Sequence, residues 1–330
     1  MIKSVLIANR GEIAIRIART ARRMGIKTYV VRTAKEPEAV YLSAADAVIN
    51  FPETDGNIPE FLDIDRLVGL AREYKIDSLH PGYGYLSENA ELAERCRDNG
   101  IVFIGPSPEV IRLMGDKVAA KGIAAQSGVP MLGASQGAVH TLDEARKIAK
   151  RLGYPVIIKA VSGGGGRGMR IVHHQDELEQ LYKIATAEAQ VAFNDPSVFI
   201  EKYLENPKHI EFQIVADNYG NVVHLGEREC SIQRKHQKLM EEAPSPALDE
   251  RLRKTMAAAA VSLAKQAGYQ SLGTVEFLLD HQKHFYFMEM NTRIQVEHPV
   301  TEEITGIDLV ELQFNIAAGR KLPLRQSQIH

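Results

Sequence analysis

The sequence predicts an α/β protein in which a parallel-sheet unit is followed by a second unit of helices and antiparallel strands. Three observations support this. The chain opens with an apolar strand, an amphipathic helix and a second strand, which is the order of a parallel βαβ unit. Two later pairs of apolar strands are each joined by a short polar turn, as in antiparallel hairpins. The 330 residues exceed one ordinary core, so we expect more than one domain.

The N-terminal unit is predicted to be a parallel sheet covered by helices. Its first helix has one apolar face, and its arginines should lie largely off that face. Gly25 should end this helix, because glycine readily adopts the left-handed conformation that follows helices. The polar loop 80–89 follows a predicted strand, where parallel sheets bind ligands. The predicted strands are 5–8, 27–31, 77–80 and 101–104, and the helices are 11–24, 61–74 and 90–98; the apolar face carries Ile13, Ile17, Ala21 and Met24, and the arginines are Arg16, Arg19 and Arg23.

The second unit begins near Gly115. Its clearest helix starts at Thr141, which forms a capping box with Glu144 three residues later. An alanine-rich helix lies between two strand hairpins, and a final helix that stops at Gly319 follows the second hairpin. The predicted helices are 116–126, 141–152, 176–192, 249–267 and 308–318, and the strands are 156–158, 169–173, 198–203, 210–216, 222–227, 273–279 and 285–291.

A glycine-rich segment between two predicted strands is the first candidate binding site. Lys159 ends the apolar strand, and five of the next nine residues are glycine. Consecutive glycines cost backbone entropy and pack nothing, so we expect a ligand to approach the main chain there. Bare N–H groups form an anion site, and Lys159 adds a positive charge. The segment does not fit the dinucleotide-binding pattern, because a strand and not a helix is predicted after it. It does not fit the P-loop pattern either, because no Gly-Lys-Ser/Thr closes the loop. We interpret the segment as a flap over phosphates; the alternative is a flexible linker.

The composition argues against several classes of function. Lys and Arg number 40 against 42 Asp and Glu, a net charge of −2 that does not favour nucleic-acid or membrane-surface binding. Cys96 and Cys230 are too few for a disulfide framework and lack metal-ligand spacing, so a reducing setting is expected. The sequence has no signal-peptide pattern at its start and no apolar run that could span a bilayer. We therefore expect a soluble, cytoplasmic protein.

The second predicted hairpin brings two carboxylates together. If its turn centres between Gln282 and Lys283, Glu276 faces Glu289 among apolar strand residues. Like charges that face each other destabilise a sheet, so a cation should lie between them. Oxygen ligands suit Mg²⁺, and Asn291 points to the same face. The alternative is a register shifted by one residue, which would turn one glutamate to solvent.

The residues after this hairpin alternate in a second pattern. From an extended segment, Arg293, Gln295 and Glu297 would project together and present a cation, an amide and a carboxylate to one small ligand. Such a set could hold a planar oxyanion and supply a base. The alternative is an ordinary polar surface strand.

A basic stretch between the two hairpins has two interpretations. A charge run is usually a solvated face. Because this one follows an apolar strand, its residues could instead line the anion pocket. The stretch contains Arg228, Arg234, Lys235, His236 and Lys238.

Seven motifs together resemble the biotin carboxylase family of the ATP-grasp superfamily. They occur in the family's order and cover essentially the whole chain. The motifs are I-A-N-R-G-E-I-A-I-R-I (7–17), H-P-G-Y-G-Y-L-S-E-N (80–89), I-R-L-M-G-D-K (111–117), K-A-V-S-G-G-G-G-R-G-M (159–169), E-K-Y-L-E-N-P-K-H-I-E (201–211), E-R-E-C-S-I-Q-R-K-H-Q-K (227–238) and E-M-N-T-R-I-Q-V-E-H-P-V-T-E (289–302).

The resemblance implies a Rossmann-like parallel-sheet domain (pre-ATP-grasp) over 1–115 and an α+β ATP-grasp domain over 116–330, with a mobile glycine-rich lid at about 132–203. It also implies binding sites for ATP, Mg²⁺ (or Mn²⁺), bicarbonate and biotin. The implied nucleotide residues are Lys117, Lys159, Gly164, Gly165, Gly166, Gly168, Glu201, Lys202, Leu204, His209, Gln233, His236, Glu276 and Glu289; the metal ligands are Glu276, Glu289 and Asn291; and the bicarbonate and biotin residues are Tyr83, Lys238, Arg293, Gln295, Val296 and Glu297.

The implied reaction is the ATP-dependent carboxylation of biotin on biotin carboxyl carrier protein. Bicarbonate would attack the γ-phosphate to give carboxyphosphate, which breaks down to CO₂ and phosphate. Phosphate would then deprotonate biotin N1′, and the resulting anion would capture CO₂. Glu297 would be the general base, Arg293 would steady the biotin enolate, and Lys238 would hold bicarbonate. A carboxyltransferase would be a further partner, within an acyl-CoA, pyruvate or similar carboxylase, and family members are often homodimers.

The sequence departs from the family pattern at its end. Family members continue past the position of His330 with a C-terminal sub-domain, absent here, that contributes an arginine to biotin and surfaces used for dimerisation. One alternative is therefore a catalytically incomplete ATP-binding fragment or regulatory subunit. Another is a different ATP-grasp ligase, which joins a carboxylate to an amine.

Overall fold

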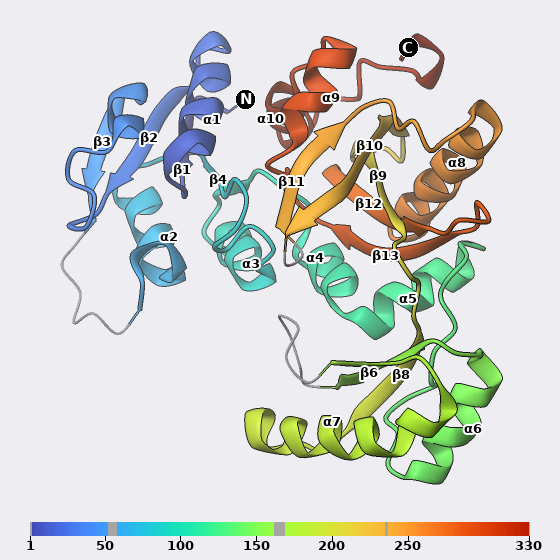
Figure 1. Cartoon of the computed structure of the whole chain (residues 1–330). Coiled ribbons are helices and arrows are strands. Elements are labelled where there is room, and N and C mark those ends of the chain that lie inside the picture. Colours follow the sequence, from blue (N-terminus) through green and yellow to red (C-terminus); the bar gives the residue numbers. More distant parts are fainter. Residues whose placement is uncertain (1, 52–57, 162–168, 235–236, 330) are drawn as a thin grey trace. The chain divides into compact units, whose positions relative to one another are not determined.

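The structure is a computed structural model that describes residues 2–51, 58–161, 169–234 and 237–329. These residues form two compact units. The first unit comprises Met1–Val129, Lys208–Leu279 and Phe287–His330, and the second comprises Pro130–Pro207 and Asp280–Tyr286. Helices and strands carry the labels of Figure 1.

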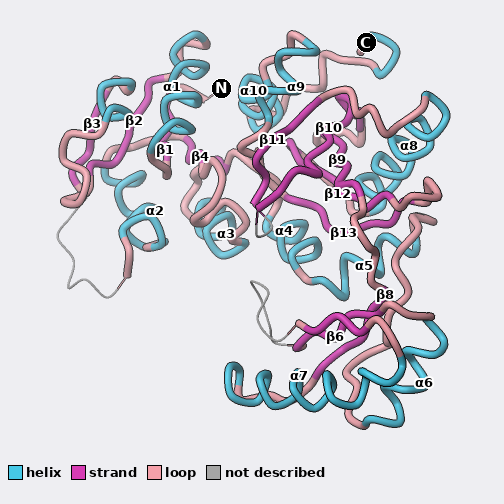
Figure 2. The backbone as a smooth tube through the Cα atoms, in the orientation of Figure 1, coloured by secondary structure: helices cyan, strands magenta, loops and turns pink. Residues whose placement is uncertain are grey.

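A five-stranded parallel sheet forms the N-terminal part of the first unit (Figures 1 and 2). Its elements are β1 (Ser4–Ile7), α1 (Gly11–Arg23), β2 (Lys27–Arg32), β3 (Ala47–Asn50), α2 (Ile64–Glu73), β4 (Ser78–His80), α3 (Ala90–Asp98), β5 (Val102–Phe103), α4 (Pro108–Gly115) and α5 (Lys117–Gln126). The strand order is β3-β2-β1-β4-β5, and every pair is parallel. The predicted βαβ opening is confirmed, and Gly25 has the positive φ expected after a helix. The helix predicted over 61–74 begins later, because a 3-10 turn at Glu60–Leu62 precedes α2.

An antiparallel sheet forms the rest of the first unit's framework. Its elements are β9 (Lys208–Ala216), β10 (Val222–Arg234), β11 (Gln237–Glu242), α8 (Glu250–Gln266), β12 (Ser271–Leu279), β13 (Phe285–Asn291), α9 (His298–Thr305) and α10 (Leu309–Ala317). The strand order is β11-β10-β9-β12-β13, and both predicted hairpins join neighbouring strands. The helix α8 packs against β9 and β10. β10 is longer than predicted, because it continues through the basic stretch to Arg234 and pairs with β11.

The first helix differs from its prediction at Arg16. The expected apolar face is present, and Ile13 and Ile17 share one core cluster with Leu309 of α10. Arg16 is also buried, at 8% exposed, and its Nη2 donates to Glu302 Oε1 (2.6 Å) and Asp308 Oδ1 (2.9 Å). Acidic residues of α9 and the start of α10 therefore neutralise a charge that periodicity had assigned to solvent.

The second unit is a three-stranded sheet with two helices. Its elements are α6 (Leu142–Leu152), β6 (Val156–Ala160), β7 (Arg170–Val172), α7 (Leu178–Phe193) and β8 (Val198–Lys202). The order is β7-β6-β8, with β6 antiparallel to both neighbours. The predicted capping box at Thr141 is confirmed, and the two helices pack on the sheet through one apolar cluster. β6 and β7 flank the glycine-rich segment as expected, but Gly164, Gly165, Gly166 and Gly168 lie outside the described residues.

Four of the described helices and strands were not predicted: β3, α4, α9 and β11. α4 had two sequence signals, since Ser107 caps its first turn and Pro108 occupies its first position. α9 also carries a proline in its first turn. Among the helices that the structure describes, none combines the length and apolar character needed to cross a membrane.

Candidate active site

A row of charged side chains crosses the antiparallel sheet of the first unit. Strand pairing places Arg228 of β10 opposite Glu211 of β9, and Glu211 opposite Glu276 of β12. Facing residues in antiparallel strands project to the same side of the sheet, so these three groups are neighbours. All three are buried. Buried charges require partners, and the partners of this row build the candidate site.

Lys238 of β11 is the cation at the centre of the carboxylates. Its Nζ lies 2.9 Å from Glu276 Oε1 and 2.6 Å from Glu297 Oε1, and it also donates to Glu211. Burial alone lowers the pKa of Lys238, but the three carboxylates outweigh burial and raise that pKa. The ammonium group is therefore charged at neutral pH, and it has as many carboxylate partners as it has hydrogens.

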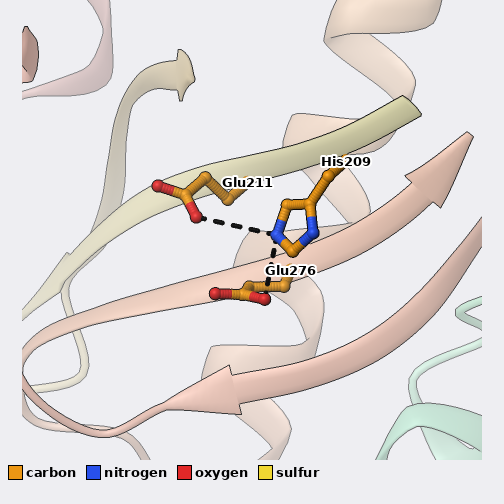
Figure 3. A group of neighbouring side chains, drawn as sticks. All are labelled: His209, Glu211 and Glu276. Carbon is orange, nitrogen blue, oxygen red and sulfur yellow. Dashed lines mark ion pairs between the residues drawn. The ribbon is translucent and has the colours of Figure 1, made fainter. Parts of the chain in front are cut away.

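His209 of β9 contacts the same carboxylates. Figure 3 shows the His209 ring beside Glu211 and Glu276, with Nε2 2.9 Å from Glu276 Oε2 and 3.8 Å from Glu211 Oε2. Gln233 Nε2 lies 3.3 Å from the other ring nitrogen. Burial raises the pKa of Glu276, but His209 and Lys238 outweigh it and hold that pKa well below its usual range. Glu276 is therefore an anion in a buried setting.

Glu289 and Asn291 of β13 lie close to Glu276, although the predicted turn position was wrong. The Asp280 amide donates to the His284 carbonyl (2.9 Å), which centres the turn half a residue earlier than expected. Further along the strand, Asn291 Nδ2 donates to Glu276 Oε1 (2.8 Å). Burial and then the charge of Glu276 raise the pKa of Glu289. The two carboxyl groups are thus near enough to repel each other.

Gln295 and Glu297 reach the site from the irregular segment between β13 and α9. The expected extended segment is not present there, so strand alternation was the wrong reason for grouping these residues. Gln295 Nε2 donates to Glu276 Oε1 (2.9 Å), and Glu297 is the residue immediately before α9. Burial raises the pKa of Glu297, but Lys238 outweighs burial and leaves that pKa lowered. Val296, between the two, is 59% exposed.

Arg293, which was predicted to project together with Gln295 and Glu297, contacts the loop 80–89. Arg293 Nε donates to Glu88 Oε2 (3.0 Å), and Arg293 Nη2 donates to Asn291 Oδ1 (3.2 Å). Tyr83 of the same loop donates its hydroxyl to Glu12. Burial and then Glu12 raise the pKa of Tyr83. The loop predicted to meet a ligand therefore contacts the segment that follows β13.

The basic stretch is not a solvated face at Arg228. That side chain is fully buried and contacts Glu211 (2.6 Å), whereas Arg234 is exposed as expected. Lys235 and His236 lie outside the described residues. Glu211 was not among the predicted site residues; its signal was a carboxylate within the apolar strand that carries His209.

Comparison with known proteins identifies the family. The family described as "Biotin carboxylase, N-terminal domain" matches residues 1–111, and "Carbamoyl-phosphate synthase L chain, ATP binding domain" matches residues 116–325. The biotin carboxylase of Nostoc sp. is 54% identical over 98% of this chain and 72% of its own length. The chain belongs to the biotin carboxylase family.

Other members agree in sequence and fold. Chloroplastic biotin carboxylase 1 of Populus trichocarpa is 50% identical over 99% of this chain, which spans 62% of that relative. A crystal structure of a Campylobacter jejuni biotin carboxylase β-γ-ATP complex matches with a TM-score of 0.91 and 47% identity, over 100% of this chain and 73% of the other. The biotin carboxylase domain dimer of Hydrogenobacter thermophilus 2-oxoglutarate carboxylase, in complex with MgADP, ADP and bicarbonate, matches with a TM-score of 0.89 and 48% identity, over 100% and 72%. The predicted fold class is confirmed.

In this biotin carboxylase family member, the second unit contains further predicted nucleotide residues. Lys159 Nζ lies 2.5 Å from Glu201 Oε2. Lys202 Nζ donates to the carbonyl oxygens of Gly153 (3.0 Å) and Tyr154 (2.9 Å), and burial lowers its pKa. The neighbouring Leu204 is half-buried. Lys117, at the start of α5 in the first unit, is exposed.

The oxygen donors around Glu276 suit a hard divalent cation. Glu276 and Glu289 offer carboxylate oxygens and Asn291 an amide oxygen, which are the ligand types that Mg²⁺ prefers. Burial and then the charge of Glu276 raise the pKa of Glu289, and a cation between the two carboxyl groups would relieve that repulsion. The Lys238 ammonium group already contacts Glu276 Oε1 (2.9 Å), so a cation would compete with it for this carboxylate.

Proposed function

We infer that this chain carries out the ATP-dependent carboxylation of biotin by bicarbonate, as a ligase of the biotin carboxylase class. Its substrates are ATP, bicarbonate and biotin presented by a carrier protein. The observation that carries this proposal is the buried group of Lys238 with Glu211, Glu276 and Glu297, at the positions where the family motifs occur. The names of the similar proteins support the same activity.

Phosphoryl transfer from ATP to bicarbonate needs positioning and charge neutralisation more than covalent help. We assign bicarbonate to Lys238, Arg293 and Gln295 with the Val296 backbone, because these residues offer two cations and an amide near one carboxylate base. Glu297 is that base. The lowered pKa of Glu297 keeps it ionised at neutral pH, as a base must be. Tyr83 and Arg293 contact biotin in this proposal.

ATP and its metal occupy the remaining predicted residues. Glu276, Glu289 and Asn291 would hold Mg²⁺ or Mn²⁺, which would neutralise charge on the transferring phosphoryl group. The nucleotide-binding residues proposed in the first unit are Lys117, His209, Gln233 and His236, and those in the second unit are Lys159, the glycines of the flap, Glu201, Lys202 and Leu204. Closure of that flap would exclude water from carboxyphosphate.

The partners in this proposal are a biotin carboxyl carrier protein and a carboxyltransferase. One similar structure is described as a domain dimer, which supports self-association as a further proposal. Human mitochondrial pyruvate carboxylase is 48% identical over 99% of this chain but extends far beyond it, so that the match covers 28% of that relative. The acyl acceptor depends on protein outside the matched region.

The test is bicarbonate-dependent ATP cleavage, measured with and without free biotin. The proposed function predicts ADP release that requires Mg²⁺ and bicarbonate and rises with biotin. ATP binding without turnover would instead support a catalytically incomplete ATP-binding protein. Turnover with an amine acceptor but none with biotin would support another ATP-grasp ligase.

A further inference from the structure

Arg228 is buried in the middle of the sheet with every hydrogen-bond donor satisfied. A guanidinium group has five N–H donors in a rigid planar fork and no acceptor. No charged group should be buried in this way without a compensating structural role, since burial of a charge is costly. Its partners are Glu211 Oε1 (Nε, 2.6 Å), Gln213 Oε1 (Nη1, 2.8 Å), Thr301 Oγ1 (Nη1, 2.7 Å), Gln295 Oε1 (Nη2, 2.8 Å) and Thr274 Oγ1 (Nη2, 3.4 Å).

The first consequence concerns the orientation of Gln295. An amide can present either its oxygen or its nitrogen to a neighbour, but a guanidinium group can only donate. Arg228 therefore fixes the Gln295 oxygen toward itself, and the Gln295 nitrogen is directed to Glu276 Oε1 at 2.9 Å. The Gln295 amide therefore donates to the same Glu276 oxygen that Lys238 contacts, and it presents its N–H side to the group of residues to which we assign bicarbonate.

The second consequence concerns Lys238. Glu211 bridges the two cations, with Oε1 on Arg228 and Oε2 on Lys238. If Arg228 were displaced, Glu211 would lose the partner that holds it in place. Lys238 would then lose a fixed anchor, although its other carboxylates would remain.

The third consequence concerns Glu297. Thr301 lies one turn after Glu297 on α9, and its hydroxyl accepts a hydrogen bond from Arg228. The same guanidinium group therefore ties the start of α9 to the sheet. Through three separate contacts, Arg228 reaches the amide, the lysine and the helix that present the bicarbonate residues.

We propose that Arg228 is the positioning residue of the bicarbonate site, acting through Gln295, Glu211 and Thr301 without touching the substrate. This proposal rests on the proposed function. It predicts that replacing the fork by a single ammonium group, while keeping the charge, will impair the use of bicarbonate far more than the binding of ATP. Misplacement of reacting groups by about 1 Å can cost about 10²-fold in rate.

The experiment compares Arg228→Lys with the wild-type chain by steady-state kinetics and by crystal structure. We expect kcat/KM for bicarbonate to fall about 10²-fold, while KM for ATP stays within about twofold. In a chain that already carries Gln295→Ala, Arg228→Lys should lower kcat/KM for bicarbonate by clearly less, because the two changes act through the same contact. The crystal structure of Arg228→Lys should show Gln295 Nε2 displaced from Glu276.

Arg253→Met is the matched control. Arg253 donates to Glu227 (2.8 Å), the residue that precedes Arg228 on β10, and its other hydrogen bonds within the described part of the chain go to the carbonyl oxygens of Ser245 and Leu248. It should leave kcat/KM for bicarbonate unchanged. Thr301→Val is a milder second variant if Arg228→Lys does not fold, and it should change the same kinetic constant in the same direction.

Three results would overturn the proposal. The first is an equal loss of kcat/KM for bicarbonate and for ATP in Arg228→Lys, and the second is additive losses of kcat/KM for bicarbonate when Arg228→Lys and Gln295→Ala are combined. The third is a variant structure in which Gln295 and Lys238 keep their positions. If the wild-type chain cleaves no ATP with bicarbonate and biotin, the proposed function fails instead. The variant structure then still decides whether Arg228 sets the orientation of Gln295.

Discussion

Replacing Lys238 by methionine should destabilise the first unit strongly at neutral pH. Methionine keeps most of the volume and removes the charge, which leaves Glu211, Glu276 and Glu297 facing one another with one cation fewer. Removing one partner of a buried ion pair typically costs about 3–5 kcal/mol. The Lys238 side chain is 19% exposed, so we expect about 3 kcal/mol, the lower end of that range.

The pH dependence follows from the pKa directions. In the wild-type chain, Glu276 and Glu297 have lowered pKa values, so their stabilisation is present above the unfolded value of about 4.3 and is lost as the pH falls through the folded values. In Lys238→Met the carboxylates lose their cation, and their folded pKa values rise. Protonation then relieves their repulsion on acidification. The stability difference should therefore be largest near pH 8 and narrow toward pH 5.

The measurement is urea denaturation followed by far-ultraviolet circular dichroism, because the chain contains no tryptophan. Urea leaves electrostatic interactions unscreened, and EDTA excludes bound divalent ions. Lys254→Met is the control: Lys254 forms an exposed pair with Glu250 on α8, and its loss should change the free energy of unfolding little, because water screens exposed ion pairs. Two results would refute this reasoning. One is an equal loss of unfolding free energy in Lys238→Met and Lys254→Met, and the other is a stability difference between Lys238→Met and the wild-type chain that does not change between pH 5 and pH 8.

Three further predictions concern other parts of the site and core. Glu297→Gln should lower kcat by about 10²–10⁴ with nearly unchanged ATP affinity, since a general base is lost; unchanged turnover would exclude that role. Glu289→Ala should raise the Mg²⁺ concentration needed for activity, and an identical metal titration would count against this ligand. Asp308→Asn keeps the helix cap but leaves buried Arg16 with one carboxylate fewer, at a cost of about 2 kcal/mol. Because the pKa of Asp308 is lowered, this cost should be present at pH 7 and disappear as the pH falls through that pKa; urea unfolding of both chains at pH 7 and pH 3 checks it.

Local sequence rules predicted most of the fold because the elements obey them. The capping residues Thr141 and Asp249 mark helix starts that the structure confirms, and the alternating strands of both hairpins pair as expected. The turn at residues 280–284 was miscentred because Lys283 adopts a positive φ of 67°. That conformation is uncommon for lysine, so the residue types gave no warning of it.

The candidate site was harder to predict where long-range pairing decides the outcome. Arg16 appeared to be a surface charge, and a solvated face was one of two interpretations of Arg228. Periodicity and charge runs carry no information about partners such as Glu302 for Arg16 or Thr301 for Arg228, which lie far away in the chain. Gln295 and Glu297 were grouped correctly as neighbours but for the wrong reason, since an irregular segment and not a strand carries them. The ligand roles of the site residues stay predictions.

The joining of the first helix to the last has a consequence for synthesis of the protein. Ile13 and Ile17 share a core with Leu309 and Phe314, and Arg16 is neutralised by Glu302 and Asp308. A ribosome releases the N-terminal sheet long before those partners emerge, so until then part of the α1 apolar face stays uncovered and Arg16 lacks its carboxylate partners. Contacts so distant in sequence slow folding, and the nascent N-terminal domain should therefore depend on chaperones until α10 has been made.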